Sequence, residues 1–244
     1  MNTWGSFGIA HLLSLAGSVL IIIGLYYLLK NRSKETIRII LFVLSLSGIG
    51  AILYNLLAWN SPIEYLPLHL CSINAMLLPI AVLTRNKTIG NLLLVWCLGA
   101  LVAIIANFEM AEATLFSESF NFYFFPHVFE FGIPVLLFKL GLVKKDPECI
   151  GSTLTITMLL YTMVHLCNLG INRYCALVGN GIRVNYMFSI EPTNPVIAMF
   201  HQLIPYEYWH MYLVLPIVGL YLILIYAPEL TAKRRSAALS RHTA

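Results

Sequence analysis

Charged residues are scarce in this chain. Only 11% of its 244 residues are Asp, Glu, Lys or Arg, about half the share of an ordinary soluble domain, while 59% are hydrophobic. No polar stretch is long enough to form a separate soluble domain, so we expect one domain over residues 1–244. This composition indicates a multi-pass membrane protein.

Several other signatures are also missing. The five cysteines are odd in number and include no C-x-x-C, which argues against a disulfide framework or a zinc knuckle. The basic residues stand in short clusters between apolar runs, so the net charge of +4 does not indicate nucleic-acid binding. The first apolar run has no basic segment before it and is long enough to span a membrane, which argues against a cleavable signal peptide.

Seven apolar runs are long enough to cross a bilayer. A hydrocarbon core of about 30 Å requires about 20 helical residues. The sequence therefore predicts an all-α fold with seven transmembrane helices, at residues 7–29, 37–59, 65–83, 89–108, 122–140, 150–170 and 208–226. Prolines inside the third and fifth runs are compatible with membrane helices, where neighbouring groups can bond the freed backbone.

The connections between these runs alternate in charge. Of the 15 Lys and Arg residues, all except Arg173 and Arg183 follow the first, third, fifth or seventh run. The opposite connections carry the acidic residues Glu64, Glu109, Glu112, Glu118, Glu191 and Glu207. Since basic connections stay in the cytoplasm, we expect a cell-membrane protein with its N-terminus outside and its C-terminus in the cytoplasm.

Polar side chains gather in the predicted outer half of the protein. Every histidine except His242 maps there, together with four asparagines and a cysteine: Asn55, Asn107, Asn168, Asn185 and Cys71. The cytoplasmic halves of the runs are nearly pure Leu, Ile and Val. Because polar side chains are costly inside a membrane, this asymmetry predicts a functional site that opens outward.

Three of these residues could form a catalytic unit. At about 1.5 Å per residue, Cys71 and His127 lie roughly 7–9 Å below the outer boundary, at the same depth as His165. Glu130 follows His127 by one turn on the same helical face and could orient the imidazole. A cysteine nucleophile needs a base, and the base benefits from such a third group. Composition alone leaves open that Cys71 is a small packing residue and that Glu130 makes a structural hydrogen bond.

Several segments carry a resemblance to a known family. They are Leu66 to Cys71 (LPLHLC), Leu83 to Asn86 (LTRN), His127, and Val184 to Met187 (VNYM). In these the chain resembles the YwaF family of bacterial integral membrane proteins, which is related to the transmembrane-protein-164 acyltransferases. A more distant similarity is to the androgen-induced hydrolases of branched fatty-acid esters, which use threonine in place of cysteine. The resemblance implies an acyl transfer between phospholipids with Cys71 as nucleophile and His127 as its partner.

The leading hypothesis is therefore a lipid acyltransferase, transacylase or ester hydrolase with its site near the outer face. Its partners would be a membrane phospholipid or lysophospholipid, with no metal and no cofactor. Candidate substrate-binding residues, some of which could hold the oxyanion, are His69, Asn55, Asn107, His165, Asn185 and Tyr186.

Two other functions remain open at this stage. Outer histidines with Glu109 or Glu112 could bind zinc in a metal-dependent lipid hydrolase, although no H-x-x-x-H or H-E-x-x-H places two ligands on one helical face. A transporter or receptor with a polar outer pocket is the third hypothesis. It is disfavoured because few polar residues continue toward the cytoplasm.

Overall fold

Each apolar run of the sequence contains a helix in the computed structural model, which describes residues 3–59, 61–106, 110–193 and 195–242. The long helices and one short helix are α1 Ile9–Leu29, α2 Lys34–Ala58, α3 Leu70–Thr84, α4 Lys87–Ala106, α5 Glu118–Lys139, α6 Cys149–Leu177, α7 Pro195–Leu203 and α8 Val214–His242. Two 3-10 turns, η1 Tyr186–Phe188 and η2 Trp209–Leu213, lie in the long connection between α6 and α8. Within the described ranges every regular element is helical, as the composition predicts.

The third predicted span is shorter in the structure than the sequence suggested. The prediction began at residue 65, whereas α3 begins only at Leu70, after His69 in an extended conformation (φ −72°, ψ 151°). Pro67 explains why the helix does not include residue 66, because proline disfavours helical backbone in the residue before it. Within the described ranges six helices are long and apolar enough to span a membrane, and the 15-residue α3 is shorter. Its length of roughly 22 Å falls below the ~30 Å of a bilayer core.

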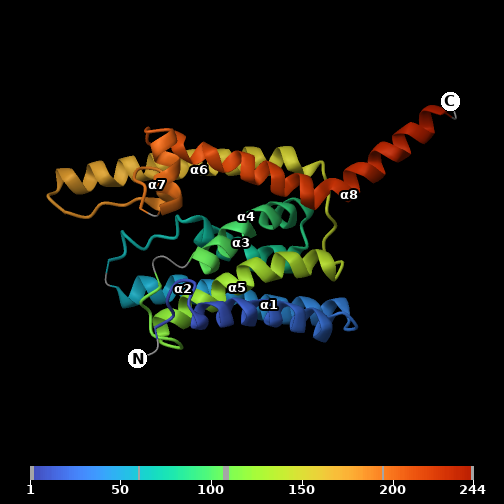
Figure 1. Ribbon diagram of the computed structural model, residues 1–244, viewed down its shortest axis with the longest axis horizontal. Helices are drawn as coiled ribbons and strands as arrows, with labels where there is room; N and C mark the ends of the chain where they lie inside the picture. Colours follow the sequence, from blue (N-terminus) through green and yellow to red (C-terminus); the bar gives the residue numbers. More distant parts are fainter. Residues whose placement is uncertain (1–2, 60, 107–109, 194, 243–244) are drawn as a thin grey trace.

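α5 lies at the centre of the bundle (Figure 1). It packs against α1, α2, α3 and α4, while α6 and α8 form a layer that contacts the rest mainly through α4. A two-residue link reverses the chain between α3 and α4, and the connection after α4 reverses it again before α5. The two helices on either side of α4 in the sequence, α3 and α5, therefore run in the same direction and contact each other directly.

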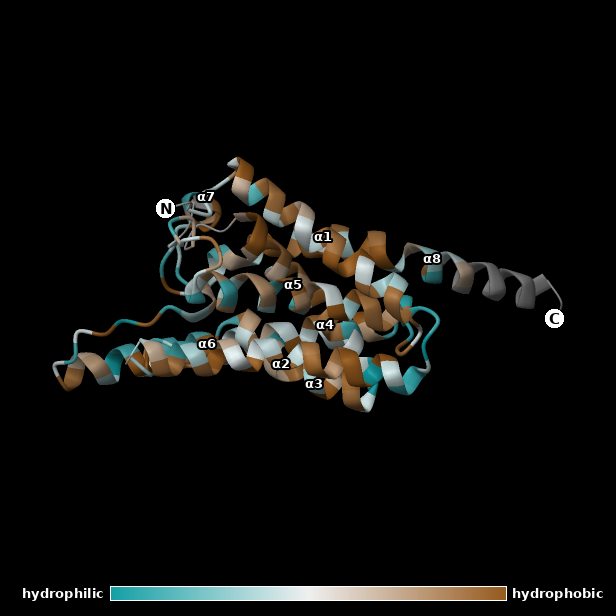
Figure 2. Ribbon diagram, turned by 90° about the horizontal axis from the view of Figure 1, so that it is seen from below, coloured by the Kyte–Doolittle hydropathy of each residue, from teal (hydrophilic) through white to brown (hydrophobic). Residues whose placement is uncertain are grey.

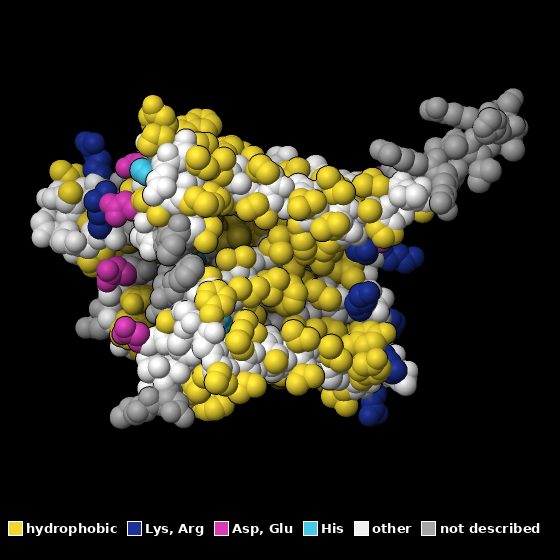
Figure 3. Space-filling model, in the orientation of Figure 1, with side chains coloured by type: hydrophobic (Ala, Val, Ile, Leu, Met, Phe, Trp, Pro, Cys, Tyr) yellow, Lys and Arg dark blue, Asp and Glu magenta, His cyan; other side chains and the backbone are white. Residues whose placement is uncertain are grey.

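Charged side chains gather at the two ends of the bundle, on either side of a broad hydrophobic band (Figure 3). Most visible Lys and Arg side chains lie at one end, and most visible Asp and Glu side chains lie at the other, beside a few basic ones. We call these the basic end, where α2 and α4 begin, and the acidic end, where α3 and α5 begin. That the basic end faces the cytoplasm stays a prediction.

The interior also differs between the two halves. Toward the basic end the core is a large aliphatic cluster that includes Leu29, Leu41 and Leu78. Toward the acidic end Trp4 is fully buried against Phe120, and its backbone N–H donates to the Ala113 carbonyl at 2.8 Å. Hydrophobic residues occur along the length of the helices (Figure 2), and many large hydrophobic side chains are exposed, among them Ile9, Leu57 and Leu224. A bundle with apolar sides and polar ends is the arrangement that a bilayer requires.

Candidate functional site

α2, α3 and α5 meet at a small buried polar layer. Asn74 of α3 and Glu130 of α5 are only 1% and 3% exposed, and the Asn74 amide lies against the Glu130 carboxyl. Oε2 of Glu130 and both polar side-chain atoms of Asn74 nevertheless have no well-formed hydrogen bond. Gly48 of α2 permits this approach, because a Cβ there would lie 2.6 Å from the Cβ of Ala75 and 3.4 Å from Oε1 of Glu130. The layer thus holds a carboxyl and an amide with unused hydrogen-bonding capacity.

Cys71 is the second residue of α3, and its side chain is half-buried. The first helical amide to bond back along the chain is Ile73 N–H, which donates to the His69 carbonyl at 3.1 Å. The amides of residues 70–72 consequently have no acceptor inside the helix. Such a helix N-terminus carries partial positive charge and favours a thiolate over a thiol.

His127 is buried in α5, one turn from Glu130 on the side of the acidic end. Its Nδ1 lies 2.7 Å from the backbone carbonyl of Tyr123, and the Tyr123 ring packs on the imidazole with 4.4 Å between ring centroids. Because a carbonyl only accepts hydrogen bonds, Nδ1 must carry the hydrogen. In the neutral imidazole, Nε2 then has the lone pair and can act as a base.

The sequence hypothesis gave Glu130 the task of orienting His127. In the structure the orienting contact at Nδ1 comes from the Tyr123 carbonyl instead. A backbone acceptor leaves no mark in the sequence, which is why pattern analysis missed it. A catalytic role for Glu130 stays a prediction.

Cys71 precedes Asn74 by three residues, and His127 precedes Glu130 by three residues. Because α3 and α5 run parallel, stepping back three residues on both helices moves about 4.5 Å toward the acidic end on each. The structure therefore places the thiol and the imidazole at one level on neighbouring helices. Whether the two side chains meet in a hydrogen bond stays a prediction.

The loop at residues 184–191, here called the cap segment, is held on the polar face of α6. Asn168 donates to the Tyr186 carbonyl at 2.8 Å and accepts from the Tyr186 N–H at 3.0 Å. Asn172 makes the same two-way contact with the backbone of Val184, at 2.9 and 2.7 Å. His165 completes the row, with Nδ1 3.0 Å from the hydroxyl of Ser189. The cap segment is thus fixed in place over the acidic end.

Two residues predicted to bind substrate have structural partners within this segment. Asn185 uses its amide on the loop itself, accepting from the Ile190 N–H at 2.9 Å and donating to the Glu191 carbonyl at 2.8 Å. Tyr186 is 1% exposed, and its hydroxyl donates to the Ile63 carbonyl. Burial raises the pKa of Tyr186 to about 12, so the hydroxyl stays protonated at neutral pH. Both residues shape the site rather than present free polar groups to it.

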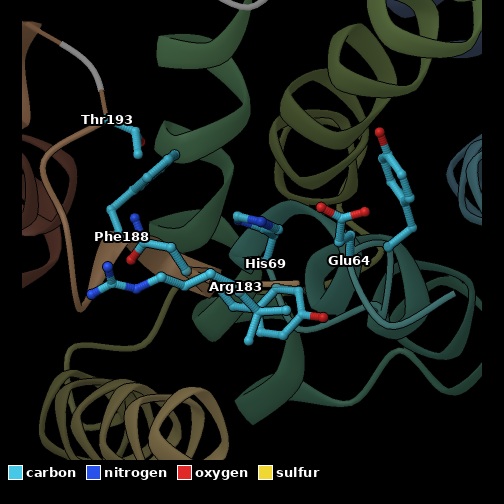
Figure 4. Close-up of a pocket in the computed structure, with 9 residues that line it drawn as sticks. Glu64, His69, Arg183, Phe188 and Thr193 are labelled. Atoms are coloured by element: carbon cyan, nitrogen blue, oxygen red, sulfur yellow. The ribbon is translucent and has the colours of Figure 1, made fainter. Parts of the chain in front are cut away.

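His69 joins the cap segment to α3. Its Nδ1 accepts from the Met187 N–H at 3.4 Å, and its ring packs edge-on against Tyr186 with 5.4 Å between centroids. His69, Asn185 and Tyr186 all line a pocket of about 270 Å³ at the acidic end, shown in Figure 4. His69, which lines this pocket, is two residues before Cys71 in the sequence.

The remaining predicted substrate-binding residues lie elsewhere. Asn55 is half-buried in the last turn of α2, and His165 belongs to the row on α6 described above. Asn107 lies outside the described residues. Asn168 and Asn172 were not predicted as site residues, although their spacing with His165 gave a usable signal. Positions 165, 168 and 172 share one helical face, and three polar residues on one face of a membrane helix indicate a polar partner.

The described side chains also bear on the metal hypothesis. Among residues 3–59, 61–106, 110–193 and 195–232, no three His, Cys, Asp or Glu side chains come together in a way that could hold a metal ion.

Comparison with known proteins identifies a family but no individual relative. A family model described as the TMEM164 family matches residues 6–227, which covers the bundle from before α1 to the middle of α8. No curated protein and no solved structure gives a significant match. With six apolar helices of spanning length, the chain is a multi-pass membrane protein.

Proposed function

The chain belongs to the TMEM164 family, and from this membership we propose that it is a membrane enzyme acting on phospholipid acyl esters. Cys71 is the nucleophile and His127 the base in this proposal. The resemblance to the transmembrane-protein-164 acyltransferases implies the same two residue types. We further propose that the chain falls in the bacterial YwaF branch, because of its LPLHLC and VNYM segments.

The observation that carries the proposal is the contact between Asn74 and Glu130 on two parallel helices. Cys71 and His127 lie three residues before Asn74 and Glu130 on the same helices, toward the acidic end. A nucleophile and a base in one layer, one turn from a buried carboxyl, is the arrangement that covalent acyl transfer needs.

The surroundings of the two residues suit their roles. The α3 N-terminus favours the Cys71 thiolate, and the same partial positive charge favours an oxyanion. Nε2 of His127 carries the lone pair because the Tyr123 carbonyl holds the proton on Nδ1. The depth predicted from the sequence for both residues, roughly 7–9 Å below the outer boundary, suits phospholipid ester carbonyls, which lie near the edge of the hydrocarbon core.

The reaction proceeds in two halves. His127 Nε2 takes the thiol proton of Cys71, and the thiolate attacks the ester carbonyl carbon of a phospholipid. The C–O ester bond breaks, the imidazolium protonates the departing lysophospholipid oxygen, and an acyl thioester remains on Cys71. A lysophospholipid hydroxyl or water then loses its proton to Nε2 and attacks the thioester carbonyl. The C–S bond breaks, the imidazolium returns the proton to the Cys71 thiolate, and a phospholipid or a free fatty acid leaves.

The test is to replace Cys71 and follow acyl transfer from an isotope-labelled phospholipid in nanodiscs. Cys71→Ala should reduce turnover by roughly 10³-fold or more, because the acyl thioester cannot form. Cys71→Ser should be severely impaired too, since a hydroxyl is much less acidic than a thiol. His127→Ala should lose a similar amount, because members of one catalytic unit do not contribute additively. Mass spectrometry should find the labelled acyl group on the Cys71 peptide of the wild-type protein.

Cys167→Ala is the matched control, because Cys167 is an exposed cysteine of α6 and its loss should leave turnover unchanged. Turnover that survives Cys71→Ala and stops with a chelator would reject the thiol mechanism and favour the metal-dependent hydrolase.

A further inference from the structure

The pocket at the acidic end carries opposite charges on its two sides. Figure 4 shows Glu64 on one side of the pocket and Arg183 on the other, with His69 between them. Glu64 comes from the segment ahead of α3, whereas Arg183 precedes the cap segment. The pocket thus separates a carboxylate from a guanidinium across a volume of about 270 Å³.

Arg183 has chemistry suited to a phosphate. Its Nη1 lies 2.7 Å from Oε1 of Glu191, but the two side chains are 63% and 47% exposed. An exposed ion pair of this kind contributes at most about 1 kcal/mol, so a phosphate can displace Glu191. A guanidinium binds phosphate through two parallel hydrogen bonds, and the Thr193 side chain lines the same side of the pocket.

The opposite side has chemistry suited to an ammonium group. The exposed carboxylate of Glu64 accepts a hydrogen bond from the Ser61 hydroxyl. The adjacent Tyr65 also lines the pocket, and its ring stacks on Trp59 at an interplanar angle of 19°. A carboxylate beside an aromatic ring is a common environment for a ligand ammonium.

We propose that this pocket binds the headgroup of a zwitterionic phospholipid. The phosphate contacts Arg183 and Thr193, and the ethanolamine or choline ammonium contacts Glu64 and Tyr65. The inference rests on the proposed function, because it places the headgroup of a donor or acceptor lipid beside Cys71. Since His69 both lines the pocket and precedes Cys71 by two residues, a headgroup held there puts its glycerol esters at the start of α3.

Lipid binding tests the inference without any turnover. The full-length protein is offered phosphatidylethanolamine and phosphatidylglycerol with identical acyl chains, and bound lipid is counted by native mass spectrometry. Both lipids carry the phosphate, but only the first carries an ammonium. The wild-type protein should prefer phosphatidylethanolamine by about tenfold, the ratio that corresponds to about 1.4 kcal/mol. Glu64→Gln should remove this preference.

Arg183→Gln should weaken binding of both lipids, because both present a phosphate. Matched controls are Glu112→Gln and Arg173→Gln, which remove exposed charges of the same predicted side outside the pocket and should leave binding unchanged. Equal binding of the two lipids by the wild-type protein, or a preference that survives Glu64→Gln, would overturn the inference.

A soluble competitor distinguishes the lipid from a free phosphoamine. Glycerophosphoethanolamine should compete only at concentrations far above those of the lipid, since it lacks the acyl chains. Competition at equal concentration would identify a soluble ligand and overturn the lipid assignment. Cys71→Ala should keep the headgroup preference. If that variant also kept turnover, the thiol mechanism would fail while the headgroup site still stood.

Discussion

Two buried asparagines show how the ends of this bundle differ. Asn91, in α4 near the basic end, is fully buried and uses both ends of its amide. It donates to the Lys87 and Lys144 carbonyls and accepts from the Asp146 N–H at 3.1 Å and the Tyr226 hydroxyl at 2.5 Å. Asn74, in α3, is equally buried, yet neither of its polar side-chain atoms has a well-formed hydrogen bond.

The difference separates two uses of a buried polar group. A buried amide with all its partners ties helices together, and Asn91 joins α4, the α5–α6 connection and α8 in this way. A buried amide without well-formed hydrogen bonds costs up to about 1–3 kcal/mol, and a lipid surrounding offers no water to offset that cost. A catalytic role is one explanation for keeping such a group. Asn91 therefore stabilises the basic end, whereas a functional role for the Asn74–Glu130 layer stays a prediction.

The largest effect is expected in a test of which side of the membrane each chain terminus lies on. A reporter that is active only in the cytoplasm should be active when fused after α8 and inactive when fused before α1, because most basic residues follow the odd-numbered predicted spans. The expected difference is all or none, measured as reporter activity in intact cells. Activity at both fusions would put both ends on one side. That result would remove α3 as a crossing segment and reverse the assignment of the site to the outer face.

A smaller effect is expected from Asn91→Ala. The substitution leaves the Asp146 amide and the Tyr226 hydroxyl without their acceptor, so the free energy of unfolding should fall by about 2–4 kcal/mol. Unfolding in mixed micelles measures this change, and turnover per folded molecule should stay at the wild-type value. Thr231→Ala, an exposed position on α8, serves as the control with a change near zero. Lost turnover at full stability would contradict the structural role of Asn91.

The smallest change in stability is expected from Glu130→Gln. Oε2 of Glu130 has no hydrogen bond to lose, so the free energy of unfolding should change by less than about 1 kcal/mol. Turnover should fall by roughly 10²-fold if the carboxyl assists His127, the usual scale for acid–base assistance. The pH profile of turnover should also change. A loss of stability as large as that of Asn91→Ala, with turnover intact, would show that the two asparagines sit in equivalent environments.

Hydropathy predicted where the helices are, and local chemistry set where they end. α5 was predicted at residues 122–140 but begins at Glu118, because the Ser117 hydroxyl caps it by accepting from the Phe120 N–H. α6 was predicted to end at residue 170 but continues to Leu177. Hydropathy falls at Asn172 and Arg173, yet the helix persists because the polar face around Asn172 binds the cap segment instead of water.

The site was predictable only where side-chain type signals chemistry. Cys71 and His127 stood out as polar residues at one depth, and their pairing stays a prediction. The Tyr123 carbonyl and the N-terminal amides of α3 belong to the backbone, so no residue type reveals them. Asn185 carried the same polar signal as a ligand-binding residue, but its partners lie in its own loop and depend on the folded path of that loop.

The parallel course of α3 and α5 constrains how this chain can vary. Residues at the same level on two parallel helices keep a constant separation in sequence. The separation between Cys71 and His127 equals the separation between Asn74 and Glu130. Insertions in the connections change that separation without disturbing either pair. One residue inserted between Cys71 and Asn74 turns one pair by about 100° relative to the other. Related chains should therefore vary freely in loop length while keeping three-residue steps within α3 and α5.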